Sequence, residues 1–247
     1  MVRYFLEIAY KGTNYAGFQI QQNANTVQAE LEKAMQIYFR NKIELTGSSR
    51  TDAGVHANQN YLHFDVENNI NDIEKTLYHL NAILPLDIVV KNIHEVNINN
   101  HCRFDAISRN YEYTICTNKN PFVLDSSYYY PYSLNIDALN ECATMLKEFT
   151  SFESFAKKNT QVFTHNCTIL NSIWKLENNI LTYNVTGNRF LRGMVRGLVG
   201  TMLLVGRGKY AVKDFKKILE SKSISKTDFS APAKGLVLME VKYKYIN

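Results

Sequence analysis

The sequence predicts an α+β fold made of two halves that share the element order β-α-β-β-α-β and a mainly antiparallel sheet. The first observation is that apolar residues alternate with polar ones along several short segments, as in half-buried strands. The second is that apolar residues between these segments recur at helical spacing, with stop signals at helix ends. The predicted elements of the second half repeat the order of the first, with one extra helix.

The first half is expected to span residues 1–103. Its predicted elements are a strand at 3–10, a helix at 26–41, strands at 42–46 and 61–66, a helix at 71–83 and a strand at 88–96. In strand 61–66, the alternation of Leu62, Phe64 and Val66 with more polar neighbours predicts one buried face. This order of elements is the split βαβ, ferredoxin-like arrangement.

The second half is expected to span residues 104–247. Its predicted elements are a strand at 110–117, a helix at 137–148, strands at 167–176 and 180–186 joined by a tight turn, helices at 190–205 and 212–221, and a strand at 235–245. Two sheet-bearing halves of this kind can pack together around a central cleft, a common place for a ligand site. Because no linker-like segment separates the halves, we expect them to form one body.

Composition favours a globular protein of the cytoplasm. The chain has 247 residues, of which 45% are hydrophobic, and no apolar run approaches the roughly 20 residues of a membrane helix. Charged residues close to Met1 predict that there is no signal peptide. The four cysteines and six histidines lack CxxC and HxxxH spacing, so we expect reduced thiols and no metal site. A net charge of +5 is compatible with an RNA partner.

The polar segment 47–57 lies between two predicted strands and holds the densest group of reactive side chains in the sequence. It contains one carboxylate, one guanidinium, one imidazole and two glycines. Arg50 and Asp52 are two residues apart, so in an extended segment both side chains point the same way, and the cation favours an ionised Asp52. A cluster of Ser, Asp and Gly residues also fits an ordinary turn.

Two further segments carry arginine and tyrosine at regular spacing. On a predicted strand, the pattern R-x-Y-x-Y places Arg109, Tyr111 and Tyr113 on one face, which also fits an ordinary tyrosine-rich sheet. A later predicted helix opens with F-L-R-G-M-V-R, which places Arg192 and Arg196 one turn apart on one face. Its glycines each cost up to ~1 kcal/mol relative to alanine, so they indicate close packing against another element.

Together with A-P-A-K-G-L-V-L at 231–238, these strings resemble four motifs of the TruA family of tRNA pseudouridine synthases, in the family's order. The string R-T-D-A-G-V-H at 50–56 matches without a gap and is the most specific of the four. The string Y-x-G-T-x-Y-x-G-F-Q at 10–19 also resembles the family, so the likeness covers the whole chain. Two residues depart from the pattern: Ser49 stands where the family usually has Gly, and Phe18 where it usually has Trp.

The resemblance implies a pseudouridine synthase fold and an enzyme that isomerises uridine to pseudouridine at positions 38, 39 and 40 of the tRNA anticodon stem-loop. Asp52 would be the nucleophile, acting on a uridine flipped out of the RNA helix. Tyr111 would lie over the uracil, Arg196 would pair with the aspartate, and Leu238 would wall the pocket. Arg50 would fill the space that the base vacates. The family also implies a homodimer, and because the reaction involves no net redox change, no cofactor or metal is expected.

Several basic residues can contact phosphates, although each also fits a solvated basic face: Arg189, Arg192, Arg207, Lys209 and Lys213. Two other functions remain open. A non-catalytic RNA-binding protein on the same fold would account for the basic charge and the many tyrosines. An acid hydrolase would need a second carboxylate beside Asp52, and the nearest candidates in the sequence are Asp65 and Asp105.

Overall fold

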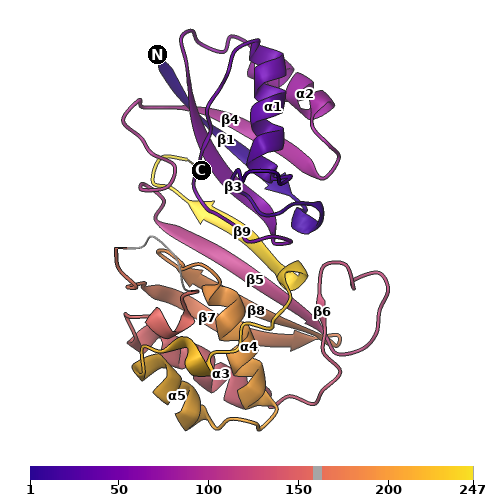
Figure 1. Ribbon diagram of the computed structural model, residues 1–247, viewed down its shortest axis with the longest axis vertical. Helices are drawn as coiled ribbons and strands as arrows, with labels where there is room; N and C mark the ends of the chain where they lie inside the picture. Colours follow the sequence, from indigo (N-terminus) through magenta and orange to yellow (C-terminus); the bar gives the residue numbers. More distant parts are fainter. Residues whose placement is uncertain (158–162, 247) are drawn as a thin grey trace. The chain divides into compact units, whose positions relative to one another are not determined.

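The protein, described by a computed structural model over residues 1–157 and 163–246, is a mixed α/β protein with mostly antiparallel strand pairs (Figure 1). Its chain divides into two compact units. Unit 1 comprises Met1–Ile107 together with Leu238–Asn247, and unit 2 comprises Ser108–Val237. The last strand, β9 (Leu236–Lys242), therefore begins in unit 2 and continues in unit 1.

Unit 1 contains six further strands and helices: β1 (Val2–Tyr10), α1 (Val27–Phe39), β2 (Thr46–Gly47), β3 (His56–Val66), α2 (Ile73–Ile83) and β4 (Ile88–Val96). Strand β1 lies between β4 and β3 and is antiparallel to both, and Leu6 pairs with Leu62 on one side and Ile93 on the other. Helices α1 and α2 lie side by side (Figure 1), and the hydroxyls of Tyr38 and Thr76 form a hydrogen bond between them at 2.9 Å.

The strand expected at 42–46 is confined to β2, so this prediction is too long. The backbone around Leu45 bonds to side chains of α1 instead of to a neighbouring strand. Its N–H donates to Glu32 Oε1 at 3.2 Å, and its carbonyl oxygen accepts from Gln28 Nε2 at 2.8 Å. These two bonds hold the chain against α1 just before it enters the polar segment.

Strand β3 buries both of its faces over residues 61–64, so the prediction of one buried face is wrong there. The second face is covered by residues close to the C-terminus. The ring of Tyr243 packs edge-on against Phe5 at 5.3 Å and against Tyr61 at 5.1 Å. The Tyr243 hydroxyl donates to the carbonyl oxygen of Cys102, which lies beside the same face.

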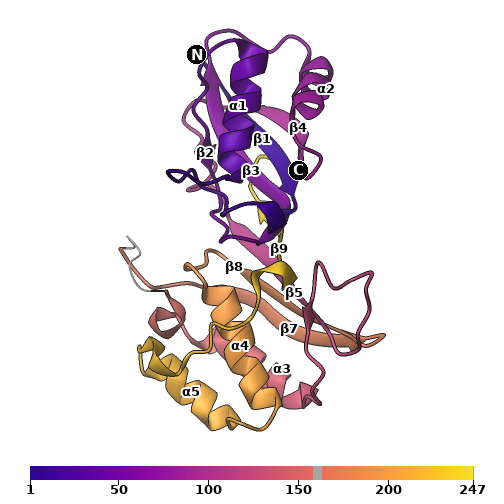
Figure 2. The ribbon, with the colours of Figure 1, turned by 45° about the vertical axis from the view of Figure 1, so that its right-hand side comes forward.

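Unit 2 contains β5 (Ser108–Cys116), β6 (Tyr128–Tyr129), α3 (Ile136–Met145), β7 (Ile169–Glu177), β8 (Ile180–Gly187), α4 (Met194–Gly206) and α5 (Val212–Glu220). Strand β8 lies between β5 and β7 and is antiparallel to both, whereas the short β6 runs parallel to β5. The helices pack on one face of this sheet (Figure 2). The β7–β8 turn holds Asn178 and Asn179 at φ angles of 51° and 62°, the left-handed backbone that a two-residue hairpin turn needs.

Helix α4 begins at Met194 and not at residue 190. Gly193 precedes it with a φ of 73°, and a Cβ there would lie 2.9 Å from the side chain of Lys157. Arg192 therefore lies outside the helix, and the expectation that Arg192 and Arg196 share one helical face is wrong. The expected close packing of the helix glycines is confirmed, because a Cβ at Gly200 would lie 2.3 Å from a backbone oxygen.

The four cysteines are free and buried, as expected for reduced thiols. Over residues 1–157 and 163–246, no helix combines the length and apolar character that a bilayer-crossing segment requires. The apolar residues instead fill the interiors of the two units, where the largest fully buried side chains are aromatic.

Candidate functional site

The polar segment between β2 and β3 carries Asp52 in a tight turn. The carbonyl oxygen of Asp52 accepts from the Val55 N–H at 3.1 Å, which closes a four-residue β-turn. Gly54 occupies the third position of this turn with a φ of 77°, a conformation that side-chain-bearing residues rarely adopt. The sequence D-A-G-V therefore sets the backbone path at the aspartate. Arg50 is exposed and Asp52 is half-buried.

The segment that follows β1 packs directly on this turn. The Gly12 N–H donates to His56 Nδ1 at 2.9 Å, and the Gly54 N–H donates to the Tyr15 carbonyl oxygen at 3.3 Å. A Cβ at Gly12 would lie 2.0 Å from the Val55 carbonyl oxygen, so only glycine fits there. Because His56 Nδ1 accepts this hydrogen bond, that nitrogen carries no proton. The imidazole of the motif therefore links the turn to the segment that follows β1.

The residue before Asp52 is held by the same segment. The Thr51 carbonyl oxygen accepts from the Phe18 N–H at 3.1 Å, and the Thr51 hydroxyl is hydrogen bonded to the Tyr10 hydroxyl at 2.9 Å. Gly17 lies against this point with a φ of 110°, and a Cβ there would lie 3.0 Å from the Thr51 oxygen. The backbone is thus fixed on both sides of Asp52.

Ser49, one of the two residues that depart from the family pattern, is buried in unit 1. Its carbonyl oxygen accepts from Asn60 Nδ2 at 3.0 Å, and the neighbouring Ser48 N–H donates to the Tyr61 carbonyl oxygen at 2.7 Å. Both serines are buried, and within the described part of the chain neither hydroxyl has a hydrogen-bond partner. The serine at position 49 therefore adds a buried polar group without adding a contact.

Strand β5 in unit 2 places Arg109, Tyr111 and Tyr113 on one buried face, as the alternation predicts. The Tyr111 ring is 8% exposed and packs edge-on against Phe190 with centroids 5.1 Å apart. Arg109 Nη1 donates to the Asn188 carbonyl oxygen at 2.8 Å. The residues just before α4 therefore hold both the arginine and the first tyrosine of this motif.

The segment 231–238, which carries the last motif, accepts hydrogen bonds from residues of the two preceding motifs. Arg196, in the first turn of α4, donates through Nε to the Ala231 carbonyl oxygen at 2.7 Å. The Tyr113 hydroxyl donates to the Pro232 carbonyl oxygen at 2.8 Å, and a Cβ at Gly235 would lie 2.8 Å from the Tyr113 ring. Burial raises the pKa of Tyr113, so its hydroxyl stays a donor at neutral pH. Sequence reasoning gave Tyr113 no role, and its position in R-x-Y-x-Y was the only signal.

Leu238 lies on β9 and is fully buried. It belongs to unit 1 together with Arg50 and Asp52, whereas Tyr111 and Arg196 belong to unit 2. Arg50 lies two residues before the turn that begins at Asp52, and Arg196 is hydrogen bonded to the last motif. The meeting of all five residues in one site stays a prediction.

Three potential metal ligands lie together in unit 1, which the search for HxxxH spacing missed because they come from separate segments. The ligand atoms of His63, His101 and Cys102 lie within 4.8 Å of one another. The Cys102 Sγ donates to the Thr46 carbonyl oxygen at 3.0 Å and lies 3.2 Å from His63 Nδ1. Burial, together with the positive charge of Arg3, lowers the pKa of His63 to about 4. In the structure these side chains form a buried cluster held by the hydrogen bonds of Cys102.

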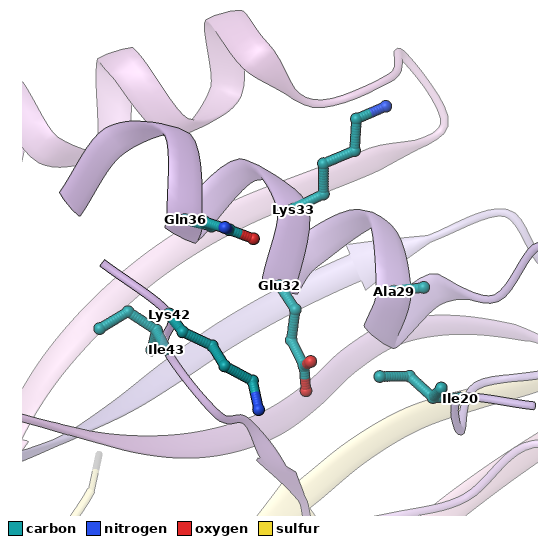
Figure 3. A pocket seen from close by; sticks show the side chains of 7 residues that line it. All are labelled: Ile20, Ala29, Glu32, Lys33, Gln36, Lys42 and Ile43. Atoms are coloured by element: carbon teal, nitrogen blue, oxygen red, sulfur yellow. The ribbon is translucent and has the colours of Figure 1, made fainter. Parts of the chain in front are cut away.

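A pocket of about 280 Å³ lies beside α1, and it contains none of the predicted site residues (Figure 3). Its lining consists of Ile20, Ala29, Glu32, Lys33, Gln36, Lys42 and Ile43. The Glu32 carboxylate in this pocket accepts from Gln28 Nε2 at 2.9 Å as well as from the Leu45 N–H. This carboxylate therefore holds the chain that leads into the Asp52 turn.

Comparisons with known proteins agree with the motifs. The model of the family described as tRNA pseudouridine synthase matches residues 8–105 and 149–244. The chain is 42% identical over 243 residues to tRNA pseudouridine synthase A of Parabacteroides distasonis, covering 98% of this chain and 96% of the relative. It is 42% identical over 242 residues to the protein of the same name from Bacteroides fragilis, covering 98% and 96%. For the Staphylococcus aureus protein, identity is 38% over 242 residues, covering 97% and 90%. The chain therefore belongs to the tRNA pseudouridine synthase family.

Proposed function

We propose that this isomerase converts uridine to pseudouridine at positions 38, 39 and 40 of the tRNA anticodon stem-loop, with Asp52 as the nucleophile. The observation that carries the proposal is the unbroken string R-T-D-A-G-V-H, whose aspartate sits in a turn fixed on both sides. The names of the relatives support tRNA as the substrate. The choice of the three positions rests on the family resemblance.

The reaction breaks the C1′–N1 bond, turns the base and forms a C1′–C5 bond, while the C5 hydrogen leaves and N1 gains a proton. No atom of water is added, and no redox partner is needed. A carboxylate acts here as a nucleophile that divides one difficult step into two easier ones. Attack on the ribose C1′ and attack on the base both fit a carboxylate in this role. The braced turn supports either route because it fixes the direction of approach.

The remaining predicted site residues serve the flipped base. Tyr111 stacks on the uracil, a contact worth roughly 1–3 kcal/mol, and its edge-on contact with Phe190 holds the ring in place. Arg196 orients the Asp52 carboxylate, as a bidentate guanidinium can. Leu238 walls the pocket and excludes water, which would otherwise capture the detached sugar. Arg50 enters the space that the base leaves in the RNA helix.

The finer features of the fold and assembly belong to the same proposal. Two ferredoxin-like halves around a central cleft would present Asp52 to an RNA helix, and a cytoplasmic homodimer would let one tRNA touch both subunits. Among the basic residues proposed for phosphate contacts, Arg207 lies 3.6 Å from the centroid of the Tyr132 ring. Its contribution would therefore combine charge with aromatic stacking.

The acid-hydrolase alternative lacks support from its candidate carboxylates. Asp65 accepts two hydrogen bonds from Arg3, at 2.7 and 2.8 Å. Asp105 accepts from the His101 N–H at 2.9 Å and from the Tyr245 hydroxyl at 2.8 Å. Both carboxylates are engaged in holding unit 1 together, so neither is placed as a second catalytic acid.

The test is release of tritium from tRNA transcripts labelled at C5 of uridine, followed by mapping of the modified positions. Asp52→Asn is expected to abolish release while tRNA binding persists. Asp72→Asn is the matched control, because Asp72 caps α2 by accepting from the Lys75 N–H, and asparagine caps a helix equally well. Full activity of Asp52→Asn would reject the nucleophile. Tight tRNA binding without tritium release from any transcript would favour the non-catalytic RNA-binding alternative.

A further inference from the structure

We infer that Tyr15 and Asp87 position the Asp52 turn, and that they set the rate of the chemical step without touching the substrate. The inference rests on the proposed role of Asp52. Neither residue belongs to the string that contains the aspartate: Tyr15 follows β1, and Asp87 directly precedes β4. Their link to the turn is visible only in the folded unit.

Three hydrogen bonds converge on Asp87. The Tyr15 hydroxyl donates to Oδ1 at 2.5 Å, Asn14 Nδ2 donates to Oδ2 at 3.0 Å, and the Lys11 N–H donates to the Asp87 carbonyl oxygen at 2.9 Å. Together they hold both ends of the short helix Gly12–Asn14 against Asp87, and we call these three hydrogen bonds the clamp. A carboxylate that accepts through both oxygens makes shorter and stronger bonds than a neutral acceptor would.

Tyr15 connects this clamp to the turn through its own backbone. Its carbonyl oxygen accepts the Gly54 N–H, two residues beyond Asp52, while its side chain reaches Asp87. The side chain is only 5% exposed. Burial and the neighbouring carboxylate raise the pKa of the Tyr15 phenol, so it remains a donor at neutral pH.

The clamp controls the turn because the contacts between them are close and involve the main chain. The Gly12 N–H donates to the His56 imidazole, the Gly54 N–H donates to the Tyr15 carbonyl oxygen, and Gly12 lies directly against the Val55 backbone. If the Gly12–Asn14 helix shifts, Gly54 and Val55 must shift with it. A displacement of about 1 Å in a group that positions the reacting atoms can lower a rate by about 100-fold. Affinity for tRNA should change little, because phosphate contacts supply most of it.

The experiment compares Tyr15→Phe and Asp87→Asn with Tyr38→Phe. Tyr38 is the matched control, because it also lies in unit 1 and also donates or accepts one side-chain hydrogen bond, to Thr76 at 2.9 Å. For Tyr15→Phe we expect kcat for tritium release to fall by about 10-fold or more, with KM for tRNA within about 2-fold of wild type. The double variant Tyr15→Phe/Asp87→Asn should lose little beyond the larger single effect, because the two residues act as one unit.

Equal kcat values for Tyr15→Phe and Tyr38→Phe would overturn the inference, as would a loss confined to KM. A second readout does not depend on catalysis. Hydrogen exchange at the Gly54 and Val55 amides should be faster in Tyr15→Phe than in Tyr38→Phe, and unchanged exchange would also overturn it. If wild-type protein released no tritium, the proposed function would fail, while the exchange comparison would still decide whether Tyr15 positions the turn.

Discussion

Replacing Gly12 with alanine is expected to displace the Asp52 turn while leaving tRNA binding intact. A Cβ at Gly12 would lie 2.0 Å from the Val55 carbonyl oxygen and 2.7 Å from its carbonyl carbon. Both are backbone atoms, so no side chain can swing aside to make room. Extending the contact from 2.0 Å to an ordinary 3.4 Å requires the two segments to separate by about 1.4 Å.

The separation would act three residues from Asp52. Because a misplacement of about 1 Å costs about 100-fold in rate, kcat should fall by about 100-fold. Overpacking of this kind also costs about 1–3 kcal/mol in the free energy of unfolding, which a protein of ordinary stability tolerates. The variant should therefore be folded, should bind tRNA, and should be nearly inactive.

Tritium release at saturating tRNA measures kcat, and filter binding measures affinity. Gly208→Ala is the control, because Gly208 has a φ of 72° and nothing lies within 4 Å of an added Cβ. That variant bears a backbone strain of about 1–2 kcal/mol without displacing a neighbour. Wild-type kcat in Gly12→Ala, or an equal loss in Gly208→Ala, would refute the reasoning.

Three further predictions concern stability. Ser49→Ala should raise the free energy of unfolding by about 1 kcal/mol, because it removes a buried hydroxyl without a partner in the described part of the chain; urea denaturation would show a decrease if that hydroxyl were satisfied. Gly200→Ala should lower the free energy of unfolding by about 1–3 kcal/mol, although alanine favours a helix more than glycine does, because the added Cβ would lie 2.3 Å from the Asp228 carbonyl oxygen. An unchanged melting temperature would contradict this prediction. The pKa of His63 is lowered from 6.5 to about 4, so the unfolded chain takes up the proton first and stability falls as pH drops from 6.5 towards 4. The free energy of unfolding should fall by about 2 kcal/mol by pH 5, and it should fall by less in His63→Gln over the same pH range. Equal decreases in the two proteins would exclude His63 as the cause.

Patterns within ten or so residues predicted the local structure well. The strand predicted at 88–96 has the same bounds as β4 in the structure. The helical spacing after Thr26 predicted α1, whose first turn is capped by the Thr26 side chain. In each case the signal and the structure that it predicts lie in the same short segment, so no tertiary contact had to be known.

Features that depend on distant contacts were not predictable in the same way. The second face of β3 is buried because Tyr243 covers it, and Tyr243 lies more than 180 residues after Tyr61 in the chain. Helix α4 starts late because Gly193 takes a left-handed conformation against Lys157, although its surroundings in the sequence look helical. The motif located Asp52, but the register that brings Asp87 to Tyr15 is set by β4 pairing with β1.

The Asp52 turn shows how glycines that are distant in the sequence can position a carboxylate in a loop. A loop has no ladder of hydrogen bonds, so its position must come from contacts with other segments. Side-chain contacts allow rotamer changes, whereas a backbone-to-backbone contact moves only if the main chain moves. Gly12 permits such a contact with Val55, and the Gly54 N–H bond to Tyr15 adds another. A larger residue at Gly12 would replace a rigid contact with a gap or a clash, so positioning of Asp52 depends on the absence of a side chain there.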